Sequence, residues 1–215
     1  MDPLLFVRRN TAIAAPPLVP EIRLYLATEI TPIWQASEAS LAQGDVPPPY
    51  WAFAWAGGQA LARYLLYHPE RVAGRSVLDF GSGSGLVAIA AAIAGAGPVL
   101  AAEIDPFAAA AIAANAALNG VAVEVTTADI SDAALAHCDI VTAGDVCYER
   151  DMTQRAISWL RQRAEHGSVV LLGDPGRTYL PETGLREIAR YTVPTSRELE
   201  DRDSRDGIIY AVLPR

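Results

Sequence analysis

The sequence predicts an α/β fold in which a mostly parallel seven-stranded sheet carries helices on both faces. From Ser76 onward, short apolar runs alternate with segments whose apolar residues recur at helical spacing. The first apolar run ends in an acid and a glycine-rich turn, and a helix-like run follows at once. At 215 residues the chain is long enough for one well-buried domain and an N-terminal extension.

The N-terminal part predicts little regular structure. Residues 1–20 are expected to form a loosely held arm, because prolines interrupt them. Alternating apolar residues over 22–28 favour a short strand. A proline-rich loop from Gly44 to Pro49 leads into an aromatic segment, and the next helix should end near His68. We therefore divide the chain into an extension, 1–47, and a domain, 48–215.

The domain predicts strands and helices in regular alternation. The expected strands cover 76–80, 99–102, 121–126, 140–143, 169–172, 191–195 and 208–213. The expected helices between them cover the run after Gly85, 106–118 and 151–163. The highly charged stretch from Arg197 to Asp206 suits an exposed connection between the last two strands.

The glycine-rich turn and the acid after the second strand predict a nucleoside site. Asp79 precedes the run Gly81-Ser82-Gly83-Ser84-Gly85, and Glu103 follows roughly 20 residues on, the spacing of a βαβ nucleotide site. The glycines let backbone approach a ligand, and Glu103 can accept hydrogen bonds from both ribose hydroxyls. A dinucleotide site needs G-x-G-x-x-G, but position 86 is Leu and no basic residue adjoins the loop. S-adenosylmethionine has no phosphate, so we favour a methyltransferase.

Further acids follow later strands. Asp129 comes after the third strand, where it is either an acceptor for an adenine amino group or a loop acid without a role. Asp145 and Tyr148 follow the fourth strand, beside the point where strand order reverses and ligands bind. The two side chains could bind a cationic amine and orient its lone pair. No basic neighbour explains Asp145 in the sequence, so we expect it in an open cleft, with little effect on stability.

Aromatic residues and overall charge narrow the range of possible substrates. Trp51 and Trp55 are either core residues or a lid over the cofactor, and their faces suit cations. Pro47-Pro48-Pro49-Tyr50 is similar to the D/N/S-P-P-Y motif of nucleic-acid amino methyltransferases, but it lacks the polar first residue and precedes the glycine loop. The net charge of −8 also argues against nucleic acid and favours a basic partner such as a lysine-bearing protein.

The chain itself contains no lysine, so all 17 basic residues are arginines and no side-chain amine of its own is available for methylation. Two cysteines are too few for a disulfide framework, and we see no metal-ligand pattern. No apolar run reaches membrane-spanning length and no signal peptide is evident. We expect a monomeric, cytoplasmic, bacterial protein without a metal.

Several motifs together resemble one family. They are Pro48-Pro49-Tyr50-Trp51-Ala52-Phe53, Trp55, Gly57-Gly58-Gln59-Ala60-Leu61, Arg63-Tyr64-Leu65-Leu66, Val77-Leu78-Asp79, Gly81-Ser82-Gly83, Ile104-Asp105-Pro106, Gly144-Asp145, Tyr148 and Gly173-Asp174-Pro175-Gly176-Arg177. From about Pro48 onward the chain resembles the electron transfer flavoprotein β-subunit lysine methyltransferases. These are Rossmann-like class I enzymes that use S-adenosylmethionine. The Trp-Ala-Gly-Gly-Gln and Gly-Asp-Pro-Gly-Arg segments are the most specific parts of the match.

The resemblance implies methyl transfer from S-adenosylmethionine to lysines of the flavoprotein β subunit. It implies that Asp145 and Tyr148 fill the D-x-x-Y/F motif, which we take as catalytic. We assign cofactor binding to Trp55, Asp79, Gly81, Ser82, Gly83, Glu103, Asp129 and Asp145. We assign substrate binding to Trp51, Asp174 and Arg177. The alternatives are a ribosomal-protein or small-molecule amine methyltransferase, and a nucleoside-binding regulatory domain without catalysis.

Overall fold

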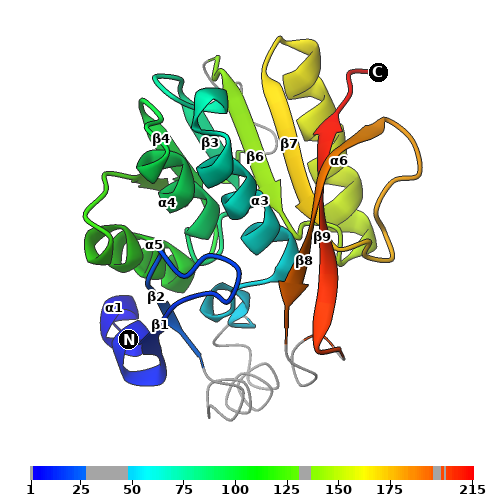
Figure 1. Ribbon diagram of the computed structural model, residues 1–215. Helices are drawn as coiled ribbons and strands as arrows, with labels where there is room; N and C mark the ends of the chain where they lie inside the picture. The colour runs from blue at the N-terminus through cyan, green and yellow to red at the C-terminus, as the bar shows by residue number, and fades with distance from the viewer. Residues whose placement is uncertain (1, 28–47, 131–136, 196–199, 201) are drawn as a thin grey trace.

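A seven-stranded sheet with the strand order β5-β4-β3-β6-β7-β9-β8 forms the centre of the protein (Figure 1). The computed structural model describes residues 2–27, 48–130, 137–195, 200 and 202–215. The strands are β3 (Val77–Phe80), β4 (Val99–Ala102), β5 (Glu124–Thr126), β6 (Ile140–Gly144), β7 (Val169–Asp174), β8 (Leu185–Pro194) and β9 (Ser204–Val212). Strands β3 to β7 are parallel, and β9 runs antiparallel to both β7 and β8. The predicted mostly parallel seven-stranded sheet is confirmed.

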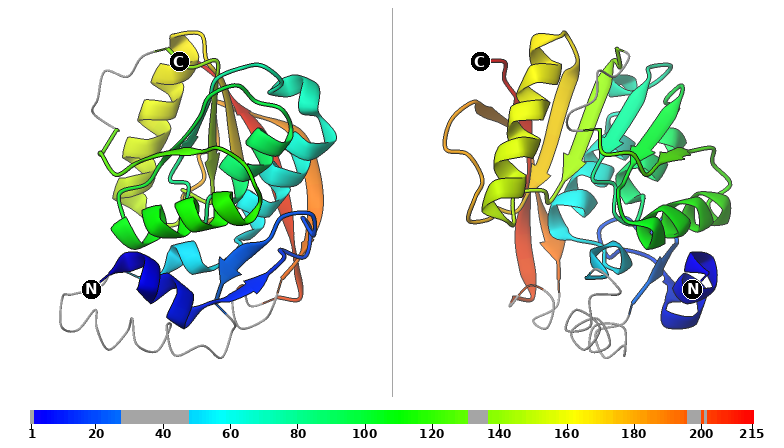
Figure 2. Two further views of the ribbon diagram at one scale, coloured as in Figure 1. Left: turned by 90° about the vertical axis from the view of Figure 1, so that its left-hand side faces the viewer. Right: turned by 180° about the vertical axis from the view of Figure 1, so that it is seen from behind.

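Helices cover both faces of the sheet (Figure 2). They are α3 (Ala56–Tyr67), α4 (Leu86–Ile93), α5 (Pro106–Leu118) and α6 (Arg150–Glu165), with single 3₁₀ turns at Tyr50–Ala52 and Pro69–Arg71. The sheet's side chains alternate between two cores, as the two-residue period of a strand requires. Val77 packs in the core under α3 and α4, whereas its neighbour Leu78 packs in the core under α6. The helices predicted from periodicity are confirmed within a few residues of their expected ends.

The N-terminal segment is more ordered than its prolines suggested. It contains α1 (Pro3–Asn10), β1 (Ala12–Ala14) and β2 (Leu24–Leu26), so the predicted loosely held arm is wrong for this part. Asp2 starts α1 by accepting hydrogen bonds from two backbone N–H groups, and Pro3 suits the first helical turn. Phe6 packs edge-on against Phe107 of α5, with ring centroids 4.9 Å apart. The domain division at residues 47 and 48 stays a prediction, because residues 28–47 lie outside the described residues.

The last strands differ from their predicted limits. Gly173 and Asp174 belong to β7 rather than to its exit loop, because they pair with Ile209 and Ile208 of β9. Residues 204–206 belong to β9, and Glu200 is 4% exposed. The expectation of an exposed connection over 197–206 is therefore wrong for the buried Glu200, and the connection ends before Ser204, although 202–204 and 206 are exposed as expected. Residues 197–199 and 201 lie outside the described residues. Throughout the described ranges, no helix is both long enough and apolar enough to cross a membrane.

Candidate functional site

A cavity of about 530 Å³ lies at the carboxyl ends of the central strands. Its volume is within the range of about 300–1,000 Å³ usual for small-molecule sites. The polar and aromatic residues that line it include Tyr50, Trp51, Trp55, Glu103, Asp129, Asp145, Tyr148, Arg155 and Arg177. The loop glycines Gly81 and Gly83 also line it. The topology therefore brings most of the predicted site residues to one place.

Glu103 closes the glycine loop at one side of the cavity. Its Oε2 accepts a hydrogen bond from the Gly83 N–H at 2.9 Å, and its Oε1 accepts one from the Asp105 N–H at 3.2 Å. Gly83 has a φ of 55°, which a residue with a side chain rarely adopts. Burial raises the pKa of Glu103, and the N–H donors oppose that rise. The carboxylate keeps lone pairs for a ligand hydroxyl at the cavity wall.

Asp79 and Ser82 support this loop from beneath and do not line the cavity. The Ser82 hydroxyl donates to Asp79 Oδ2 at 2.5 Å, and the Thr142 hydroxyl donates to Asp79 Oδ1 at 2.8 Å. Burial raises the pKa of Asp79 to about 6. Their side chains hold the loop in shape, and their predicted contact with the cofactor stays a prediction. Asp129, in contrast, is exposed and lines the cavity as expected.

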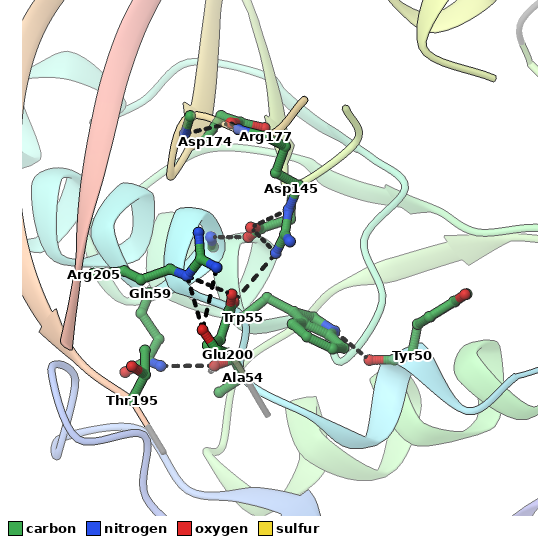
Figure 3. A network of polar contacts seen from close by, with 12 residues as sticks. Tyr50, Ala54, Trp55, Gln59, Asp145, Asp174, Arg177, Thr195, Glu200 and Arg205 are labelled. Atoms are coloured by element: carbon green, nitrogen blue, oxygen red, sulfur yellow. Dashed lines mark hydrogen bonds and ion pairs between the residues drawn. The ribbon is translucent and has the colours of Figure 1, made fainter. Parts of the chain in front are cut away.

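Asp145 is buried and fully engaged rather than placed in an open cleft (Figure 3). Its Oδ1 accepts hydrogen bonds from Arg177 Nη2 at 2.7 Å and Nε at 3.2 Å. Its Oδ2 accepts one from the backbone N–H of Gly58 at 2.7 Å. Among the described residues it is the only non-glycine with positive φ, at 57°. The sequence-based view that nothing basic neighbours Asp145 is wrong, because Arg177 lies 32 positions away in the chain.

Glycines allow α3 to reach this site. A Cβ atom added to Gly57 would lie 2.3 Å from the carbonyl oxygen of Gly173 in β7. A Cβ atom added to Gly144 would lie 3.1 Å from the Cα of Gly58. The first turn of α3 therefore lies directly against the ends of β6 and β7. The positive end of the helix faces the Asp145 carboxylate and stabilises its negative charge.

A second acid continues the network beyond Arg177. Glu200 Oε1 lies 3.3 Å from Arg177 Nη2, and Glu200 Oε2 lies 2.9 Å from Arg205 Nε (Figure 3). The guanidinium of Arg177 also lies over the ring of Trp55, 5.5 Å from its centroid. Sequence reasoning missed Glu200 and Arg205, because a run of charged residues is normally a solvated connection. Only the fold shows that one acid of this run is buried.

Asp174 shapes the loop that carries Arg177 and does not line the cavity. Its Oδ1 accepts hydrogen bonds from the backbone N–H groups of Gly176 at 2.8 Å and Arg177 at 2.7 Å. Burial, together with the nearby charge of Asp145, raises the pKa of Asp174 to about 6. Its predicted contact with substrate stays a prediction, whereas Arg177 itself reaches the cavity.

Aromatic rings form the remaining wall. The rings of Tyr50 and Tyr148 lie 5.2 Å apart, and the indole N–H of Trp55 donates to the Tyr50 carbonyl oxygen at 2.8 Å. Trp51 is 2% exposed, so it is a core residue and a cavity wall at once. Burial raises the pKa of Tyr148 to about 12, so its phenol stays neutral. Tyr50 was not among the predicted site residues, although the proline-rich segment before it was a usable signal.

The described part of the chain holds no cluster of three or more His, Cys, Asp or Glu side chains suited to a metal ion. The acids that line the cavity include Glu103, which is bound to the glycine loop, and Asp145, which is ion-paired with Arg177. Glu103 is thus available to accept hydrogen bonds from ribose hydroxyls on one side of the cavity. Asp145 is available to bind a cation on the other side.

Comparisons with known proteins agree with this chemistry. The mouse electron transfer flavoprotein beta subunit lysine methyltransferase is 38% identical, covering 100% of this chain and 86% of the mouse protein. The human protein of that name is 34% identical, covering 100% of this chain and 84% of its own length. The family model for ribosomal protein L11 methyltransferase (PrmA) matches residues 61–146.

Solved structures share the fold at low identity. Magnesium protoporphyrin IX methyltransferase from Synechocystis PCC 6803, with bound SAH, has a TM-score of 0.53 at 18% identity, covering 71% of this chain and 80% of that one. Ribosomal protein L11 methylase from Lactobacillus delbrueckii has a TM-score of 0.51 at 22% identity, covering 75% of this chain and 81% of that one. The predicted Rossmann-like class I methyltransferase fold is confirmed.

The source of the relatives corrects one expectation. Proteins that match four fifths of this chain or more include those of mouse, Xenopus laevis, human and Caenorhabditis elegans, all of them animals. The expectation of a bacterial, cytoplasmic protein is contradicted by this finding. That expectation had rested on two cysteines, too few for a disulfide framework, and on the lack of an evident signal peptide.

Proposed function

Because the chain belongs to the electron transfer flavoprotein β-subunit lysine methyltransferase family, we propose that it methylates lysines of the flavoprotein β subunit, using S-adenosylmethionine. The enzyme is a methyltransferase by fold and family. One observation carries the proposal of an amine substrate: a single cavity holds a ribose acceptor, Glu103, and an ion-paired carboxylate, Asp145. A lysine side chain is a cation that such a carboxylate can bind.

The residues of the glycine loop fit S-adenosylmethionine better than a dinucleotide. The Gly83 N–H, which could face a pyrophosphate, donates to Glu103 instead. Glu103 would accept the ribose hydroxyls, while Gly81 and Gly83 let the loop backbone approach the nucleoside. When bound, S-adenosylmethionine supplies an electrophilic methyl group on a sulfonium ion. The aromatic rings of the cavity suit that positive charge.

The chain's own residues must deliver a neutral amine. A free lysine has a pKa near 10.4, so about one in a thousand is neutral at pH 7. The walls formed by Trp51, Tyr50 and Tyr148 desolvate the amine and lower its pKa, whereas the negative charge of Asp145 raises it. In the free enzyme Arg177 and the Gly58 N–H already balance that charge. Positioning and desolvation are therefore the main contributions of the protein.

Mass spectrometry of the flavoprotein β subunit tests the proposal. The subunit is incubated with S-adenosylmethionine and either wild-type enzyme or the E103A variant, and its lysine-containing peptides are sequenced. We expect methylated lysines with the wild type and a much smaller amount with E103A. An unmodified subunit, under conditions where the enzyme binds the cofactor, would contradict the proposal.

The same experiment compares the flavoprotein subunit with the alternative substrates. Ribosomal protein L11 belongs in it, because the L11 methyltransferase of Symbiobacterium thermophilum is 33% identical over 53% of this chain. Faster methylation of L11 or of a free alkylamine than of the flavoprotein subunit would favour the alternative substrates. Cofactor binding without transfer to any of them would favour a regulatory nucleoside-binding domain.

A further inference from the structure

The guanidinium of Arg177 occupies the position where the proposed function places the substrate cation. It lines the cavity and lies 2.7 Å from Asp145 Oδ1. Gly58 already holds the other oxygen of Asp145 through a backbone N–H at 2.7 Å. A lysine ammonium that binds Asp145 from the cavity must therefore share Oδ1 with Arg177 or displace it. We propose that Arg177 is a placeholder, which holds the cation position of Asp145 until a substrate lysine displaces it.

This inference rests on the proposed function and adds a step to it. The step needs somewhere for the displaced guanidinium to go, since an unpaired buried charge is costly. Glu200 provides that place, because its Oε1 already lies 3.3 Å from Arg177 Nη2. Arg205 fixes Glu200 from the other side, at 2.9 Å from Oε2. A small rotation of Arg177 would keep one ion pair with Glu200 while freeing Asp145.

Arginine suits a placeholder at this position for a chemical reason. A guanidinium stays protonated in proteins, and its delocalised nitrogens are much poorer nucleophiles toward a methyl donor than a neutral amine. The carboxylates of Asp145 and Glu200 outweigh the effect of burial and raise the pKa of Arg177 further. A lysine at position 177 would instead place an amine of the enzyme itself in the methylation site. The whole chain contains no lysine, so neither position 177 nor any other position offers a side-chain amine of the enzyme to the methyl donor.

The exchange also selects for cations. A neutral polar side chain that displaced Arg177 would leave the Asp145 charge without a counter-charge in a buried site. An ammonium replaces the guanidinium charge for charge. After the ammonium loses a proton to solvent, its hold on Asp145 weakens and Arg177 can return. The amine is then neutral and lies within the aromatic walls.

The R177K variant tests the proposal, because it replaces the placeholder with an amine in an otherwise lysine-free chain. Purified R177K is incubated with S-adenosylmethionine alone and its intact mass is measured. We expect the enzyme to gain one or more methyl groups, which fragmentation assigns to position 177 rather than to the N-terminal amine. In that reaction the new nitrogen forms a bond to the methyl carbon, the carbon–sulfur electrons pass to sulfur, and the nitrogen's proton goes to solvent.

R190K is the matched control. Arg190 pairs with Glu187 and Asp206 on the exposed edge of the sheet, so the same substitution there should stay unmethylated. The double variant E103A/R177K should lose the modification, because it removes the ribose acceptor. No modification of R177K by an enzyme whose wild type methylates the flavoprotein subunit would overturn the placeholder. Failure of both reactions would remove the proposed function, and with it this inference.

A kinetic measurement supplies the second test. In R177Q the competitor for Asp145 is gone, so KM for the lysine substrate should fall severalfold. A rise in KM with a fall in kcat would show that Arg177 orients Asp145 for the reaction, and would overturn the placeholder. R177Q leaves acids unpaired and is first checked for a native melting transition. If R177Q does not fold, the mass measurement on the charge-conserving R177K variant still tests the placeholder.

Discussion

The two sides of the cavity, with the residues that support them, are built in different ways. We call the glycine loop, Glu103 and the supporting Asp79, which all lie within one βαβ unit, the cofactor half, after the function proposed for it. We call Asp145 and Arg177, with the supporting Gly58 and Glu200, the amine half, and the contact between Gly58 and Asp145 joins residues 87 positions apart. A local motif thus forms the first half, whereas the tertiary fold assembles the second.

The halves also differ in how charge is balanced. In the cofactor half, backbone N–H groups and hydroxyls bind the carboxylates of Glu103 and Asp79. In the amine half, Asp145 and Glu200 are paired with arginines in a mostly buried site. Removing one charge there leaves another without its partner. Function and folding stability should therefore be coupled in the amine half and separable in the cofactor half.

The largest effect should come from D145A, which tests that coupling. We expect methyl transfer to fall at least about a hundredfold, a loss typical of a positioned catalytic group. The free energy of unfolding should drop by roughly 3 kcal/mol, because Arg177 loses its closest partner. Activity assays and thermal melts check both effects. Because the carboxylate is buried, the unchanged melting temperature expected from the sequence no longer holds. A native melting temperature in D145A would show that function and stability are not coupled in the amine half.

The glycine contact between α3 and β7 should be nearly as sensitive. G57A places a Cβ atom 2.3 Å from the Gly173 carbonyl oxygen, so the helix must move away from the site. We expect a loss of about 3 kcal/mol, measured by chemical unfolding. The adjacent G58A is the control, because its Cβ atom meets nothing closer than 3.8 Å and keeps the N–H donor. Equal destabilisation by the two variants would show that the close approach is not the cause.

The D174N variant should change how stability depends on pH. The pKa of Asp174 is raised to about 6 from an ordinary value of 3.8, so the folded state binds its proton more tightly than the unfolded state. The contribution of this group to stability is therefore full below about pH 4, falls through about pH 6, and is constant above. The change amounts to about 3 kcal/mol. Melting temperatures across this window should vary less in D174N than in wild type.

Asp79 titrates in the same window, since its pKa is also raised to about 6. Some slope should therefore remain in D174N, and the double variant D79N/D174N should be flatter still. Parallel curves for wild type and D174N would mean that Asp174 does not bind its proton more tightly in the folded state.

E103A should separate binding from folding in the cofactor half. The variant removes a charged acceptor worth about 1.5–3 kcal/mol, so the affinity for S-adenosylmethionine should fall at least about tenfold. Isothermal titration calorimetry measures that loss, and thermal melts should show a smaller effect than in D145A. The variant E103Q separates the effect of charge from that of side-chain size, because it removes the negative charge and keeps the size of the side chain. Unchanged affinity in E103A would place the ribose elsewhere.

Y148F should have the smallest effect. The pKa of Tyr148 is raised to about 12, so the phenol holds its proton throughout the working range. We expect turnover within about threefold of wild type and an unchanged pH profile between about pH 7 and 9. Y148A, which removes the ring from the cavity wall, should lose more activity. A profile that shifts in Y148F would give the hydroxyl a role in proton transfer.

Sequence reasoning placed Glu103 and the glycine loop at one site for a physical reason, and the hydrogen bond between Gly83 and Glu103 confirms that placement. Their contact with a cofactor stays a prediction. Strand, glycine turn and Glu103 are close in the chain, and their chemistry follows from their order. An ion pair between residues far apart in the chain cannot be inferred from their order in the sequence. Arg177 was therefore expected near the site but not as the ion-pair partner of Asp145. The charged run was misjudged because the burial of Glu200 depends on arginine partners that local composition does not reveal. The arm was misjudged although Asp2 and Pro3 are a local signal for a helix start, because the later prolines were given more weight.

Strand β9 lies between β7 and β8 although it follows both of them in the sequence. An interior strand of the sheet is thus synthesised after every other strand of that sheet. Glu103 and the glycine loop can find each other while translation continues, since Glu103 and Gly83 are only 20 positions apart. Arg205 arrives with β9 itself. A newly made chain should therefore acquire its nucleoside pocket before its amine pocket, and premature termination near the C-terminus would yield a protein without a complete amine site.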